Sequence, residues 1–123
     1  MPHDPLAMRS LRARRDFVNA YRRGRRHVTP GFILQMQPHD APEIGLGLTA
    51  SKKVGRAVAR NRARRRMRAL ARQILPQHGR TAHAYVLVAR PPMLTRPWQD
   101  CVRDLHAALQ RVHAVKRKTH HAG

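Results

Sequence analysis

The sequence has very few acidic residues. Its 123 residues include 6 Asp and Glu against 26 Lys and Arg, which gives a formal net charge of +20 at pH 7. Such a chain repels itself, so its stable state is expected to include a polyanion. Arginine greatly outnumbers lysine, and guanidinium binds phosphate with two hydrogen bonds and stacks on bases. The composition therefore favours nucleic acid over an anionic membrane surface.

Cysteine, metal-ligand clusters and long apolar runs are also scarce. The single cysteine, Cys101, excludes an internal disulfide framework, indicates a reducing compartment and is expected to fill the core. No run approaches the roughly 18 apolar residues of a membrane span, and the N-terminus has no signal-peptide pattern. The nine histidines show no zinc spacing. We expect a cytoplasmic protein with no membrane segment and no metal site of its own.

The acidic residues are too dispersed for a protein nuclease, which needs clustered carboxylates for a divalent metal or a positioned acid and base pair. They are Asp4, Asp16, Asp40, Glu43, Asp100 and Asp104. The last two share a helix face at i and i+4, and we expect them to pair with Arg96, Arg103 or histidine. No catalytic residue is therefore predicted in the polypeptide.

Arginine is abundant, and it is concentrated in one predicted helix. The apolar stripe of this helix comprises Ala63, Met67, Leu70, Ala71, Ile74 and Leu75. The opposite side carries Asn61, Arg65, Arg68 and Arg72, with Arg62 and Arg66 in a neighbouring row. An ordinary solvated face would mix these charges with Glu at i, i+4, and here no acidic residue is available. The helix is expected to bind a polyanion, and RNA is the predicted one.

The two ends of this helix carry further signals. Arg60 and Arg64 fall near the apolar stripe, where an unpaired guanidinium is costly to bury. The first turns are therefore expected to project beyond the core into solvent or a partner. Pro76, followed by Gly79, predicts that the helix ends near Leu75.

The other segments predict an α+β protein, a single compact α/β sandwich of order α-β-β-β-α-β-α with a small mixed sheet. The first predicted element is a helix over 11–23, with Ser10 as N-cap and Gly24 as stop. Two short strands within 27–37, with a kink at Pro30 and Gly31, and a strand over 44–50 precede the arginine helix. A strand over 84–89 follows it, and the last element is a helix capped by Thr95 with an apolar stripe from Trp98 to Val112. The strand over 84–89 should lie parallel to that over 44–50, with the arginine helix as crossover.

The predicted organisation is one domain with two short extensions. Residues 1–9 are read as a flexible lead-in, residues 10–114 as a single RNA-binding α/β domain, and residues 115–123 as a disordered basic tail.

A run of residues also carries a family resemblance. Ser51-Lys52-Lys53-x-Gly55-x-Ala57-Val58-x-Arg60-Asn61-Arg62-x-Arg64-Arg65-x-x-Arg68 resembles the signature of the protein subunit of bacterial ribonuclease P. The resemblance extends from about Leu11 to about Leu109 and includes Asp16-Phe17, Gly24, Phe32-Ile33-Leu34 and Val86-Leu87-Val88-Ala89-Arg90. It implies a left-handed crossover through the arginine helix, and a ribonucleoprotein that removes the 5′ leader of precursor tRNA. In that family RNA cleaves the phosphodiester bond with magnesium, which is bound mainly by the RNA.

Charge and resemblance together predict an RNA-binding set. Its members are Lys52, Lys53, Arg56, Arg60, Asn61, Arg62, Arg64, Arg65, Arg68 and Arg72. Two roles stay open for Asn61, a bond to RNA and a bond that fixes the early turns of the helix.

Phe17 and Tyr21 form an aromatic pair at i and i+4, for which two roles are open, core packing and a stacking platform for unpaired bases. The resemblance implies that they border the cleft for the single-stranded leader, together with Ile33 and Gln35. The family often carries an aromatic residue where Gln35 stands, which narrows the expected stacking surface.

The predicted partners are the catalytic RNA subunit and precursor tRNA, with no membrane and no obligate protein partner. A ribosomal protein or a general RNA chaperone would explain the charge equally well, but not the ordered signature. A helix-turn-helix DNA binder needs a helix directly before the arginine helix, where a strand containing Gly45 and Gly47 is predicted.

Overall fold

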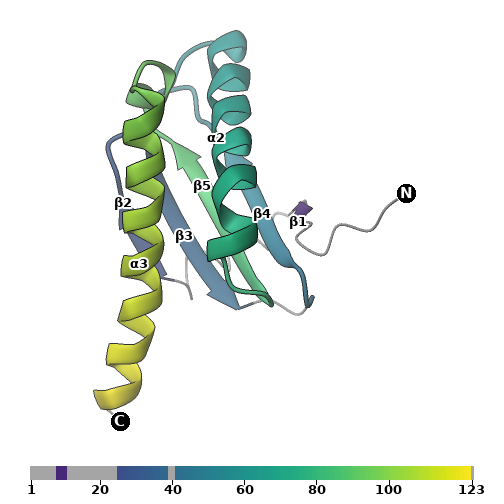
Figure 1. The fold of residues 1–123 in the computed structure, drawn as a ribbon. Coiled ribbons are helices and arrows are strands. Elements are labelled where there is room, and N and C mark those ends of the chain that lie inside the picture. Colours follow the sequence, from purple (N-terminus) through teal and green to yellow (C-terminus); the bar gives the residue numbers. More distant parts are fainter. Residues whose placement is uncertain (1–7, 11–24, 39–40, 123) are drawn as a thin grey trace.

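A mixed β-sheet forms the centre of the fold (Figure 1). The structure, a computed structural model, describes residues 8–10, 25–38 and 41–122. Within these residues the sheet has five strands in the order β1-β4-β5-β3-β2. They are β1 (Met8–Ser10), β2 (Arg25–Val28), β3 (Phe32–Pro38), β4 (Ile44–Thr49) and β5 (His83–Ala89). β4 is parallel to β1 and β5, whereas β3 is antiparallel to β2 and β5.

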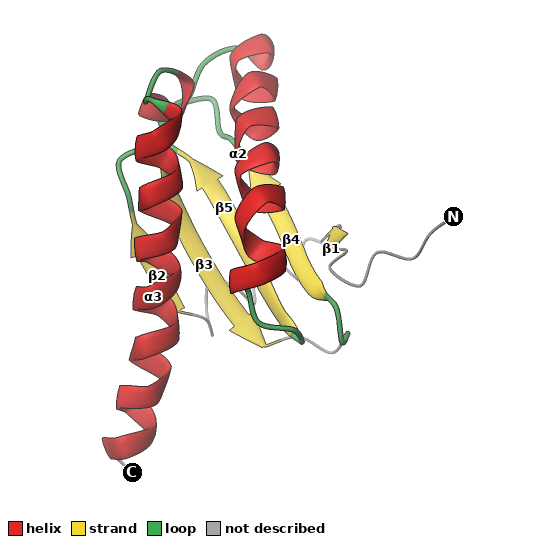
Figure 2. Cartoon of the chain, viewed as in Figure 1, coloured by secondary structure: helices red, strands yellow, loops and turns green. Residues whose placement is uncertain are grey.

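Two helices lie side by side on one face of this sheet (Figure 2). They are α2 (Ala57–His78) and α3 (Trp98–Ala122), and the short 3₁₀ helix η1 (Pro91–Leu94) precedes α3. α2 connects β4 to its parallel neighbour β5, with Leu46 opposite Tyr85 in the register. The predicted crossover is therefore confirmed, while its left hand stays a prediction.

The core lies between the sheet and the two helices. Phe32, Leu34 and Met36 alternate along β3 and are all buried against the helical layer. The predicted stripe of α2 is confirmed, because all six of its apolar residues are buried. The stripe of α3 is confirmed as well, with buried Cys101, Leu105, Ala108, Leu109 and Val112 and partly buried Trp98 and Val102.

The segment predicted as a kink between two strands is a full reversal of the chain. β2 and β3 form an antiparallel hairpin in which Val28 lies opposite Ile33. The Thr29 amide donates to the Phe32 carbonyl at 2.8 Å, and the buried Thr29 hydroxyl donates to the same oxygen at 2.7 Å. Pro30 and Gly31 are therefore the two central residues of a tight turn, a role for which both residue types are suited.

Both predicted helix boundaries at the crossover and after it are wrong by about one turn. α2 continues through Pro76 to His78, and the Gly79 amide closes it by donating to the Leu75 carbonyl at 2.7 Å. Proline removes one helical hydrogen bond, but its fixed φ is helical, and the buried residues before it hold the helix in place. Thr95 ends η1 instead of capping α3, because the Pro97 carbonyl accepts the first amides of that helix.

Two terminal predictions also differ from the structure. Met8–Ser10, which covers part of the predicted lead-in and the predicted N-cap, forms β1 and pairs with the edge of β4. Three residues are too short to show an alternating pattern, and edge pairing needs only backbone groups. α3 continues to Ala122, through the predicted disordered tail. The predicted helix over 11–23 lies outside the described residues.

Replacement of a core residue of α2 should destabilise the protein strongly. Leu70 is fully buried, whereas Val58 on the same helix is 80% exposed. Leu70→Ala should lower the free energy of unfolding by about 2–5 kcal/mol, because it leaves a cavity. Val58→Ala, the matched control, should leave it nearly unchanged. Urea unfolding measures both, and an equal loss in the two variants would contradict the assigned core.

Candidate nucleic-acid interface

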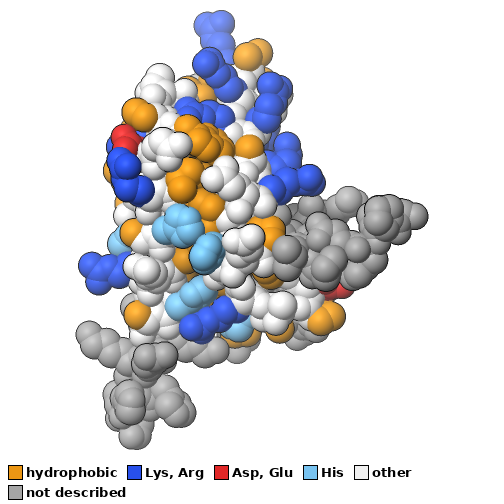
Figure 3. All heavy atoms as spheres, viewed as in Figure 1, with side chains coloured by type: hydrophobic (Ala, Val, Ile, Leu, Met, Phe, Trp, Pro, Cys, Tyr) orange, Lys and Arg blue, Asp and Glu red, His pale blue; other side chains and the backbone are white. Residues whose placement is uncertain are grey.

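α2 exposes a cationic surface opposite the face that it buries. The buried stripe fixes the rotation of the helix about its axis, so the residues on the opposite side of the helix point outward. The exposed arginines are Arg56, immediately before α2, and Arg62, Arg65, Arg68 and Arg72 on the helix itself. Figure 3 shows Lys and Arg side chains gathered over the upper part of α2 and along one side of it. α2 itself contains no acidic residue that could neutralise this charge.

The length of this surface suits a nucleic-acid strand. A rise of about 1.5 Å per residue separates Arg62 from Arg72 by roughly 15 Å along the axis. Phosphates of one strand recur every few ångströms, so several of them can meet the same row of guanidinium groups.

A tight turn presents two lysines at the start of α2. The Val54 amide donates to the Ser51 carbonyl at 3.0 Å, and the Gly55 amide donates to the Lys52 carbonyl at 3.1 Å. The Lys53 amide donates to the Ser51 hydroxyl at 3.2 Å. Val54 is buried and anchors the turn, whereas Lys52 and Lys53 are exposed. Both predicted lysines therefore lie beside the N-terminus of the cationic helix.

Gly55 allows the chain to enter α2 directly from this turn. Its φ is +146°, and a Cβ atom there would lie 2.8 Å from the Cβ of Ala59. Any other residue would be both strained and crowded. Arg56 follows as N-cap without a side-chain capping bond, and no acidic residue lies in the first turn. The free amides and the positive end of the helix dipole therefore add to the attraction for an anion.

Arg60 and Arg64, which were expected to project beyond the core into solvent or a partner, are half-buried. The Nε atom of Arg60 is shielded from solvent and has no hydrogen-bond partner in the structure. Arg64 donates to the side-chain oxygen of Asn61 one turn earlier. This bond supports the role of Asn61 in fixing the early turns, and a bond from Asn61 to RNA stays a prediction.

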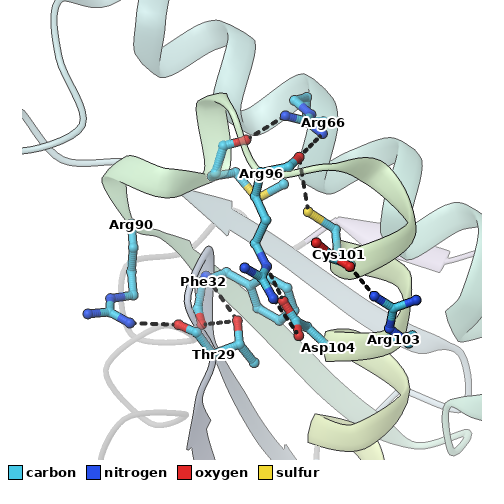
Figure 4. Close-up of polar contacts among 10 residues, drawn as sticks. Thr29, Phe32, Arg66, Arg90, Arg96, Cys101, Arg103 and Asp104 are labelled. Atoms are coloured by element: carbon cyan, nitrogen blue, oxygen red, sulfur yellow. Dashed lines mark hydrogen bonds and ion pairs between the residues drawn. The ribbon is translucent and has the colours of Figure 1, made fainter.

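The side chain of Arg66 is held by another part of the fold (Figure 4). It donates to the carbonyls of Met93 and Arg96, each at 2.8 Å. These acceptors are backbone oxygens at positions 27 and 30 residues further along the chain. No pattern of side chains in the sequence could have indicated such a contact.

Two carboxylates of α3 are paired with arginine. Asp104 accepts from Arg96 at 2.7 Å, and Asp100 accepts from Arg103, as predicted. The rings of His78 and His106 meet edge to face with centroids 4.7 Å apart. The residues that the structure describes bring no group of three or more His, Cys, Asp or Glu together in a way that could hold a metal ion.

Cys101 lies in the core, as predicted. Its side chain is fully buried in the first turns of α3, and burial raises the pKa of its thiol. The thiol therefore stays protonated near neutral pH, which is unsuited to a nucleophile.

The predicted leader-binding residues are only partly described. Phe17 and Tyr21 lie outside the described residues. Ile33 and Gln35 alternate with the core residues of β3, so they face away from α2 and α3. Ile33 is half-buried, whereas Gln35 is only 7% exposed. Of these two candidate leader-binding residues, Ile33 therefore exposes the larger surface for contact with a ligand.

An α+β fold that exposes one uncompensated cationic helix is typical of a nucleic-acid-binding protein. Over the described ranges, no helix is long and apolar enough to cross a membrane. Sequence comparison places the chain more closely, because the family model Ribonuclease P matches residues 7–113. The chain belongs to the family of ribonuclease P protein components.

Individual relatives agree with this assignment. The ribonuclease P protein component of Ruegeria pomeroyi is 46% identical over 110 residues, which cover 86% of this chain and 87% of that protein. The corresponding protein of Paramagnetospirillum magneticum is 42% identical over 117 residues, which cover 91% of this chain and 87% of that protein. These similarities do not favour the alternatives of a ribosomal protein or a general RNA chaperone.

Solved structures share the fold. The RNase P protein from Thermotoga maritima superposes with a TM-score of 0.72 at 21% identity, over 84% of this chain and 96% of that one. The RNase P protein of Staphylococcus aureus gives a TM-score of 0.64 at 24% identity, over 82% and 92% of the two chains.

Proposed function

We propose that the chain is the protein subunit of a ribonuclease P ribonucleoprotein, which removes the 5′ leader from precursor tRNA in the cytoplasm. The partner of the chain is the catalytic RNA subunit, and the chain has no obligate protein partner. The observation that carries the proposal is the row of exposed arginines on α2, a helix without a single acidic residue. Membership in the family of ribonuclease P protein components supports the catalytic RNA as the polyanion that this row meets.

The predicted RNA-binding residues divide by their exposure. Arg62, Arg65, Arg68 and Arg72 are free on the outer side of α2 to contact phosphates. Arg56, Lys52 and Lys53 extend the contact to the N-terminal end of the helix. Arg60 and Arg64 are half-buried, and the bond from Arg64 to Asn61 holds the early turns of α2 together.

Loss of two exposed arginines should weaken the electrostatic part of binding. Arg62→Ala combined with Arg65→Ala should lower affinity for the catalytic RNA and reduce the slope of log K against log salt by about one to two units. Arg111→Ala removes an exposed charge from α3 and serves as the control, with little expected change. Filter binding over a salt series measures the slope. An unchanged slope in the double variant would show that these arginines are ordinary solvated side chains that do not contact the RNA.

The chemistry of cleavage belongs to the RNA in this proposal. Asp100 and Asp104 are engaged by arginines, and the described acidic residues form no cluster suited to a divalent ion. Magnesium is then bound mainly by the partner RNA, with no dedicated site on the protein. The protein binds the RNA and extends recognition along the substrate.

Purified protein freed of its RNA should therefore not cut precursor tRNA at any magnesium concentration. Added catalytic RNA should restore site-specific cleavage to the same preparation. Gel analysis of the 5′ leader product decides the matter, and cleavage by rigorously RNA-free protein would overturn the assignment of catalysis to RNA.

The single-stranded leader is the part of the substrate that the protein is proposed to bind. Phe17, Tyr21, Ile33 and Gln35 are the candidate residues. Ile33 and Gln35 lie on the sheet face turned away from the cationic helix. Two separate surfaces then serve the two RNAs, so leader binding and RNA-subunit binding can be changed independently.

Removal of the aromatic rings should affect long leaders alone. Phe17→Leu and Tyr21→Leu keep apolar character but lose the stacking face, which is worth about 1–3 kcal/mol per base. Each variant should lose affinity for a precursor with a leader of several nucleotides, keep its affinity for a precursor with a one-nucleotide leader, and bind the catalytic RNA as before. Equal weakening for both precursors, or a loss of several kcal/mol in stability, would assign the pair to the core instead.

A further inference from the structure

Figure 4 shows the guanidinium of Arg66 bonded twice to the connection between β5 and α3. Nη1 donates to the Met93 carbonyl and Nη2 to the Arg96 carbonyl, both at 2.8 Å. Its Cζ atom lies 5.8 Å from the centroid of the Trp98 ring, within the range of a cation–π contact. Two donors and one face of the group are thus occupied by the protein itself.

The connection from β5 to α3 that accepts these bonds is braced elsewhere as well. The Arg96 side chain donates to Asp104 of α3 at 2.7 Å. Arg90 reaches the β2–β3 turn, where its amide donates to the Gly31 carbonyl at 2.9 Å and its side chain to the Thr29 carbonyl at 2.7 Å. The connection is therefore a fixed bridge between α3 and the sheet, and α2 is attached to it.

The N-terminal turns of α2 depend on this attachment because they have few other anchors. No residue from Ala57 to Arg62 is buried, and Ala63 is the first member of the buried stripe. Arg66 follows Ala63 within one turn and, among the residues that the structure describes, makes the first hydrogen bonds from an α2 side chain to another element. A small rotation at this level would shift every exposed arginine before it.

We propose that Arg66 is a positioning residue for RNA binding, which clamps α2 to the β5–α3 connection and so sets the direction in which the cationic turns project. It does not itself contact the RNA. This inference rests on the proposed function, and it separates one arginine of the run from its neighbours by role.

Lysine substitutions distinguish the clamp from a phosphate contact. Lysine keeps the charge, so it can replace arginine opposite a phosphate, but it lacks the planar fork that reaches two carbonyls at once. Arg66→Lys should bind the catalytic RNA several-fold more weakly, with an unchanged salt slope. Arg111→Lys, at an exposed arginine of α3 outside the proposed RNA-binding set, is the control and should bind nearly as the parent does. Affinity is measured well below the unfolding temperature of each variant.

Methionine substitutions supply the complementary measurement. Arg62→Met should reduce the salt slope by about one unit, whereas Arg66→Met should lower affinity with the slope retained. A slope reduced in Arg66→Met as in Arg62→Met would show that Arg66 contacts phosphate, and would overturn the clamp. Parent-like affinity in folded Arg66→Lys would also overturn it, since the bonds would then be purely structural. If Arg62→Met alters neither affinity nor slope, it is the proposed function of α2 that fails.

Discussion

Burial of one face of α2 is the interaction on which the rest of the structure depends. The helix concentrates like charges, and each pair at i, i+4 opposes helix formation by roughly 0.2–0.5 kcal/mol. Burial of a large apolar side chain contributes about 1.5–3 kcal/mol, and Met67, Leu70, Ile74 and Leu75 are all buried. These four contributions exceed the repulsion several-fold. The cationic helix therefore forms because the sheet and α3 cover its other face.

The same burial converts a charge-rich segment into a directed surface. Once the stripe is fixed, Arg62 and Arg65 must face solvent, where the proposed contact with the partner RNA would supply the negative charge that the helix lacks. The arginines are nevertheless not equivalent. Arg64 bonds Asn61 within the helix, and Arg66 bonds two carbonyls of another element. Charge alone thus identifies the helix that we propose to bind RNA, while the role of each arginine depends on its direction.

Periodicity predicted most of the fold, and its errors fall where a pattern was short or a local signal was overridden. The stripe from Ala63 to Leu75 and the parallel pairing of β4 with β5 follow from runs long enough to show a period. Pro76 was read as a stop, but packing of the turn before it outweighs the lost hydrogen bond. Pro97 disfavours the helical conformation in the residue before it, so α3 begins after this proline and not at Thr95.

The sequence by itself determined the charge, the amphipathic helices, the signature of the family and hence the class of partner, because these properties depend on residues a few positions apart. Tertiary structure alone decided that β5 lies between β3 and β4, that Gln35 is buried, and that Arg66 is turned inward. The physical reason is the nature of the contacts. Sheet order and the Arg66 clamp depend on backbone groups, which every residue carries, and these groups meet only when segments far apart in the chain have packed together.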